Sequence, residues 1–146
     1  MRKLLLALAF AVGLCPAAFA QTLVCGKSAS GNGCTPIMVS DASVSISVAT
    51  NSTTQLIAAN ASKRIYVTSF LLQSAGTASV SFNYGTGTNC GTGTTALTGT
   101  MAMTAQNVIA MGTGLGAVLE VPIGNALCIV NSASVQVSGA MSYAQF

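Results

Sequence analysis

The chain has 146 residues, of which 51% are hydrophobic and only 5% are charged, and it contains no histidine and no tryptophan. Without histidine, and with only two acidic residues, acid–base catalysis near neutral pH has almost no side chains to work with. The five basic residues form no cluster that would suit a nucleic acid or an anionic membrane, so we expect neither as a partner.

The first twenty residues have the features of a cleavable signal peptide. Arg2 and Lys3 form a positive start, residues 4–14 are apolar, and residues 18–20 (Ala-Phe-Ala) form a small-x-small cleavage site. The apolar run is too short for a transmembrane anchor. We therefore expect cleavage after Ala20 and an exported protein that is periplasmic, surface-bound or extracellular. A lipoprotein modified at Cys15 is the weaker alternative, because Leu14 stands where a small residue is preferred.

An even number of cysteines remains after cleavage, which predicts disulfides formed in an oxidising compartment. They are Cys25, Cys34, Cys90 and Cys128. Three pairings are possible, and we favour Cys25–Cys34 with Cys90–Cys128, because the first bridge closes a short glycine-containing loop within residues 21–40. A zinc site is disfavoured, because the cysteines lack close paired spacing and no histidine can assist. We predict no metal site.

Eight strands are expected after this segment. In chain order they cover residues 43–48, 54–58, 63–73, 78–84, 107–111, 117–121, 126–130 and 134–143. Polar and apolar residues alternate in 43–48, 78–84 and 134–143, which indicates half-buried strands with a hydroxyl-rich outer face. Residues 63–73 and 126–130 are apolar on both faces, which predicts central strands covered on both sides. We expect only one short helical turn, at residues 95–97.

These strands predict an all-β domain at residues 41–146, an antiparallel β-sandwich or jelly roll. Phe146 at the end of the chain also raises a small outer-membrane β-barrel. That alternative is disfavoured, because most predicted strands are shorter than a membrane span and tryptophan girdles are missing.

None of the candidate chemical motifs in the sequence favours an enzyme. Residues 91–96 match the G-x-G-x-x-A dinucleotide fingerprint, but no strand precedes them and no helix follows, so we expect a surface loop and no cofactor. Asp41 and Glu120 would have to form any glycosidase-like carboxylate pair, and nothing in the sequence brings them together. Lys63 adjoins Arg64 at a strand entry, where a solvated, edge-protecting role is expected rather than activation of a serine. We predict no catalytic residues.

The aromatic residues allow two interpretations. They are Tyr66, Phe70, Phe82, Tyr84 and Tyr143. If these rings were exposed, they would form a platform on which sugars could stack. Their alternation with the period of a strand favours the other interpretation, in which they pack in the core.

Several segments are similar to a group of small bacteriophage-associated proteins. The matching segments are residues 63–72, 84–99, 112–119, 122–129 and the stretch from 134 to Phe146. The resemblance implies a virion-associated or uncharacterised β-sandwich module without catalytic residues. It also supports pairing Cys90 with Cys128, because both lie in matching segments. Residues up to Ser40 lie outside it, and the leader departs from virion proteins that assemble in the cytoplasm.

The sequence therefore predicts an exported, non-enzymatic structural or adhesive module, which self-associates as a homo-oligomer or within a phage-like surface assembly. A carbohydrate-binding module that uses exposed tyrosines and the loop at residues 85–93 to bind a surface glycan is the alternative. A hydrolase using Asp41 and Glu120 is a remote third.

Overall fold

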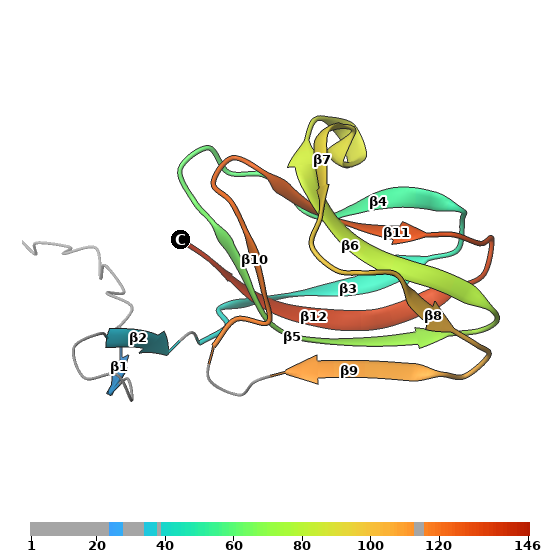
Figure 1. Cartoon of the computed structure of the whole chain (residues 1–146), viewed down its shortest axis with the longest axis horizontal. Coiled ribbons are helices and arrows are strands. Elements are labelled where there is room, and N and C mark those ends of the chain that lie inside the picture. The colour runs from blue at the N-terminus through green and yellow to red at the C-terminus, as the bar shows by residue number, and fades with distance from the viewer. Residues whose placement is uncertain (1–23, 28–33, 38, 113–115) are drawn as a thin grey trace, which may run out of the picture.

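The protein folds as an all-β antiparallel sandwich, as the sequence predicted (Figure 1). The computed structural model describes residues 24–27, 34–37, 39–112 and 116–146. The expected signal peptide and its cleavage site after Ala20 lie outside the described residues.

Two five-stranded antiparallel sheets make up the sandwich. Sheet I contains β3 (Ala42–Val48), β5 (Ile65–Ser74), β9 (Val108–Gly112), β10 (Leu119–Val121) and β12 (Val137–Gln145). Sheet II contains β4 (Ser52–Ile57), β6 (Ala78–Thr86), β7 (Thr92–Ala96), β8 (Met101–Met103) and β11 (Ala126–Asn131).

Each sheet has one edge made of two short strands. In sheet I, β10 and β9 pair in succession with β5, followed by β12 and then β3. In sheet II, β7 and β8 pair in succession with β6, followed by β11 and then β4. The sandwich therefore has four strand positions in each sheet.

The core lies between the sheets and consists of the apolar residues that alternate along each strand. Its largest fully buried side chains include Ile46, Ile65, Leu72, Phe82, Leu127, Ile129 and Met141. Phe82 of β6 contacts Phe70 of β5 edge to face, with ring centroids 5.0 Å apart and an interplanar angle of 65°. Such aromatic pairs add stability beyond the apolar area that they bury. The alternation in the sequence therefore identified the inward faces correctly.

One of the two strands expected to be covered on both faces is not. β5 is central within sheet I, but on its outer face Leu71 is 47% exposed and Gln73 is exposed as well. For β11 the prediction is correct, because its outward-facing Ala126 and Cys128 are buried beneath the segment that contains Cys90. A continuous apolar run therefore indicated a strand covered on both faces in β11 but not in β5.

The expected helical turn at residues 95–97 is wrong. Thr95 and Ala96 belong to β7, and the helical turn lies earlier, at η1 (Thr88–Cys90). β7 and β8 were not expected, because β7 is exposed along its whole length and β8 has only three residues. Neither strand has an alternation that a sequence could reveal.

The last predicted strand begins later than expected, because a buried asparagine holds a turn before it. Asn131 is fully buried; its Nδ2 donates to the Val135 carbonyl at 2.9 Å, and its Oδ1 accepts from the Ala133 N–H at 3.3 Å. These bonds close residues 131–135 into the connection between β11 and β12. Strand β12 consequently starts at Val137 rather than at Ser134.

Replacing Asn131 with alanine is expected to lower the free energy of unfolding by about 1–3 kcal/mol, because two backbone groups lose their partner. Urea unfolding followed by circular dichroism measures the change. Asn51→Ala is the matched control, since Asn51 is exposed between β3 and β4, and its effect should stay within about 0.5 kcal/mol. Equal effects of the two substitutions would contradict the role of Asn131.

The N-terminal segment forms a separate pair of strands. β1 (Val24–Lys27) pairs antiparallel with β2 (Cys34–Ile37), and Cys25 lies opposite Pro36 in this register. The side chains of Cys25 and Cys34 lie outside the described residues, and their pairing stays a prediction.

Candidate binding surfaces

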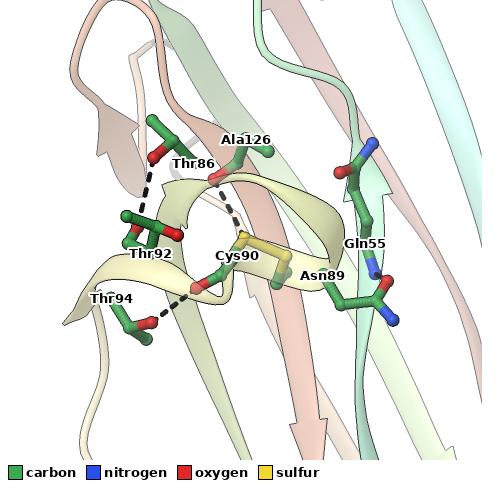
Figure 2. Close-up of a disulfide and its surroundings, with 8 residues drawn as sticks. Gln55, Thr86, Asn89, Cys90, Thr92, Thr94 and Ala126 are labelled. Carbon is green, nitrogen blue, oxygen red and sulfur yellow. Dashed lines mark hydrogen bonds between the residues drawn. A yellow bond between two sulfur atoms is a disulfide. The ribbon is translucent and has the colours of Figure 1, made fainter.

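The predicted bridge between Cys90 and Cys128 is confirmed, and it fixes a loop over the outer face of sheet II (Figure 2). Cys90 is the last residue of η1, and Cys128 lies in the centre of β11, with 6.3 Å between their Cα atoms. Both residues are buried together with Ala126. Next to the bridge, the Oδ1 of Asn89 accepts from the backbone N–H of Gln55 in β4 at 3.2 Å. The loop therefore reaches from β6 across β11 to the edge strand β4.

The backbone of this loop is tightly turned. Asn89 and Cys90 have positive φ values of 50° and 57°. A Cβ atom on Gly85 would lie 2.9 Å from the carbonyl oxygens of Cys90 and Thr92, so only glycine fits there. Residues 91–96, the dinucleotide-like motif, follow this turn. They were expected to form a surface loop, but residues 92–96 form the exposed strand β7. The motif therefore lacks the helix N-terminus that would bind the pyrophosphate of a dinucleotide.

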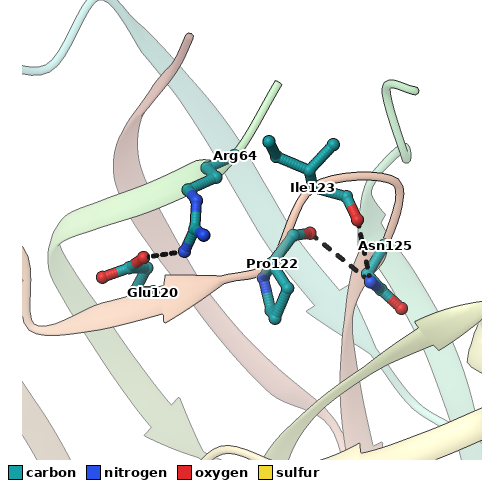
Figure 3. Close-up of polar contacts among 5 residues, drawn as sticks. All are labelled: Arg64, Glu120, Pro122, Ile123 and Asn125. Atoms are coloured by element: carbon teal, nitrogen blue, oxygen red, sulfur yellow. Dashed lines mark hydrogen bonds and ion pairs between the residues drawn. The ribbon is translucent and has the colours of Figure 1, made fainter. Parts of the chain in front are cut away.

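Charged side chains gather at one end of sheet I (Figure 3). Arg64 precedes β5 and forms an ion pair with Glu120 of β10, which lies opposite Tyr66 in the register. The two side chains are 43% and 50% exposed, so solvent screens the pair and its contribution to stability is small.

An aromatic pair lies at the same end. Tyr66 stacks on Phe146, with ring centroids 4.8 Å apart and an interplanar angle of 25°. Two backbone hydrogen bonds between Arg64 and Phe146, of 2.9 and 3.2 Å, fix the end of the chain against the start of β5. Phe146 is 43% exposed. The surface defined by Arg64, Tyr66, Glu120 and Phe146 is here called the aromatic corner.

The structure distributes the predicted aromatic residues between core and surface. Phe70 and Phe82 are buried in the core, and Tyr84 and Tyr143 are partly buried against it. Tyr66 instead takes part in the aromatic corner. Its partner Phe146 was not predicted to join it, because about eighty residues separate the two rings in the sequence and only the sheet register brings them together.

The two carboxylates singled out in the sequence are not neighbours in the fold. Glu120 lies on β10, whereas Asp41 lies directly before β3, and β5 and β12 run between these strands. Three strand spacings of about 4.8 Å place the strand axes about 14 Å apart. Glycosidase carboxyl pairs are closer, about 5–9.5 Å apart.

A metal site has no support among the residues that the structure describes. Within them, no group of three or more histidine, cysteine, aspartate or glutamate side chains could hold an ion. Both cysteines of the sandwich are joined in the disulfide, so neither offers a free thiolate.

The outer side of sheet I carries a broad uncharged surface, here called the serine face. Across the strands, one row is Gly112, Ser69, Ser142 and Ser43, and the next is Ala110, Leu71, Ala140 and Ser45. A shallow groove follows these rows across β9, β5 and β12. In a neighbouring row of the same face, Val108 of β9 is 52% exposed.

Comparison with known proteins finds no matching family model, no matching curated protein and no matching solved structure. Among the described residues, no helix is both long and apolar enough to cross a membrane.

Proposed function

We propose that this protein is an exported, non-enzymatic structural or adhesive module that self-associates or joins a phage-like surface assembly, for example as a decoration protein. The observation that carries the proposal is the serine face. Its rows are built from serine, alanine and glycine with Leu71 at the centre, and they contain no charged residue.

A surface of this kind suits contact with other protein surfaces. Burying a charged side chain costs a large desolvation energy. A serine hydroxyl costs much less, and hydrogen bonding to a group on the opposing surface offsets that cost. Interface centres are likewise depleted of charged residues. The exposed side chains of Leu71 and Val108 add apolar area that water solvates poorly.

Two further observations support the remaining parts of the proposal. The Cys90–Cys128 bridge fits a protein that matures in an oxidising compartment, as the predicted leader implies. The strand separation between Asp41 and Glu120 supports a role without catalysis. The resemblance to phage-associated modules favours a virion or surface assembly over a free secreted protein.

The oligomeric state of the exported protein tests the proposal. Size-exclusion chromatography with light scattering should give a mass above that of one chain at micromolar concentration, and the mass should rise with concentration. A single-chain mass at every concentration up to the millimolar range would overturn self-association.

A carbohydrate-binding module is the second candidate, and the aromatic corner favours it. An exposed aromatic ring next to arginine and glutamate side chains offers stacking and hydrogen bonding to a sugar. On this alternative, a glycan array gives binding that Tyr66→Ala abolishes. The absence of any array signal would remove it.

A further inference from the structure

The four edges of the two sheets differ in how well they are protected against pairing with another chain. An exposed edge strand presents unpaired N–H and C=O groups and invites a further strand. Proteins block such edges with charges, prolines, bulges, short strands or a covering loop.

Three of the edges carry such a device. The edge at β9 and β10 is divided into strands of five and three residues, and β10 carries Glu120. The edge at β7 and β8 is divided in the same way and contains Gly93 at a φ of 62°. At β4, the side chain of Asn89 accepts the N–H of Gln55, and η1 packs against the strand.

β3 forms the fourth edge and has none of these devices. It is seven residues long, from Ala42 to Val48, and contains no charged residue, proline or glycine. Its pairing with β12 runs through all seven residues without a bulge. Among the described strands, only β12 pairs with β3, so its other edge meets no strand.

We propose that β3 pairs antiparallel with β3 of a second copy of this chain, so that the two copies of sheet I join into one continuous sheet. This inference rests on the proposed self-association and names the contact through which it occurs. The pairing has two-fold symmetry, which closes the assembly at the level of a dimer.

The sequence of β3 is complementary to itself in this arrangement. With Ser45 on the two-fold axis, Ser43 lies opposite Ser47 of the second copy, and Val44 lies opposite its Ile46. Serines on the outer face therefore meet serines, and apolar residues on the inner face meet apolar residues. Cross-strand pairs of like polarity stabilise a sheet, and no like charges oppose each other.

The inner face gains burial from the same contact. Ile46 and Val48 are buried within one chain, whereas Val44 is only partly buried at the edge of the core. A second β3 alongside covers Val44 and continues the core across the junction. A glycan or an unrelated protein offers no comparable match to the alternating edge.

A pair of lysine substitutions tests the contact. Ser45 and Ser138 are both exposed on the serine face, but Ser45 lies on the edge strand and Ser138 lies on β12, inside the sheet. Ser45→Lys places two ammonium groups opposite each other at the two-fold axis, so the dimer dissociation constant should rise about tenfold or more. Ser138→Lys is the matched control and should leave it unchanged. Light scattering over a dilution series measures both.

The possible outcomes are distinct. Dissociation by Ser45→Lys alone supports the inference. Equal dissociation by both variants shows that copies stack through the serine face, and no effect of either shows contact elsewhere; each result overturns edge pairing while self-association stands. A wild-type protein that is always a monomer overturns self-association and edge pairing together.

Hydrogen exchange of the wild-type protein gives a test that needs no variant. The amides of β3 that point away from β12 should exchange more slowly in concentrated than in dilute solution. Protection that is independent of concentration would mean that the edge is covered within one chain, and it would overturn the inference.

Discussion

Replacing both Cys90 and Cys128 with alanine is expected to lower the free energy of unfolding by about 4 kcal/mol. The bridge closes a loop with a sequence separation of 38 residues, and the loop-entropy model assigns a closure of this length about that value. The substitution also releases the turn at Asn89 that contacts β4. Guanidinium unfolding of the oxidised proteins measures the difference.

A reducing agent provides the control for this effect. Once the disulfide of the wild-type protein is reduced, its unfolding midpoint should approach that of the double alanine variant. If the oxidised proteins differ by less than about 1 kcal/mol, the bridge does not constrain the unfolded chain as the model requires.

Phe82→Ala is expected to cost about 3–5 kcal/mol, because it leaves a large cavity in a closely packed core. Phe82 has no exposed surface and loses its edge-to-face contact with Phe70 on truncation. Thermal unfolding and urea unfolding both report the loss, and the melting temperature should fall along with the urea midpoint.

Two other substitutions calibrate the Phe82 result. Phe82→Leu keeps most of the volume and should cost clearly less than alanine. Phe146→Ala removes a ring that is 43% exposed, and its cost should be about 1 kcal/mol. A Phe82→Ala cost no larger than that of Phe146→Ala would show that the core tolerates the cavity.

The sequence predicted the strands whose environment is asymmetric. In β3, the alternation of Val44, Ile46 and Val48 with serines reflects one face in the core and one in water, so strand and facing were both correct. Exposed β7 has no such asymmetry, because all five of its residues are exposed and neither of its faces lies in the core. A strand exposed on both faces shows no alternation of polar and apolar residues, and β7 was therefore missed.

Sites that depend on long-range register were also beyond prediction. The aromatic corner forms because Arg64 lies opposite Phe146 and Glu120 lies opposite Tyr66. These relations depend on which strands are neighbours and on the bulges between them. The spacing of residues within one segment of the sequence shows neither. The pairing of Cys90 with Cys128 was predictable, because the four cysteines outside the expected leader allow only three pairings.

The position of the charges has a consequence for crowded conditions. Asp41, Lys63, Arg64 and Glu120 all lie near one end of sheet I, so the serine face far from that end generates little repulsion between neighbouring molecules. Added salt has almost nothing to screen there. Any contact that another molecule makes through the serine face is therefore expected to be nearly indifferent to ionic strength.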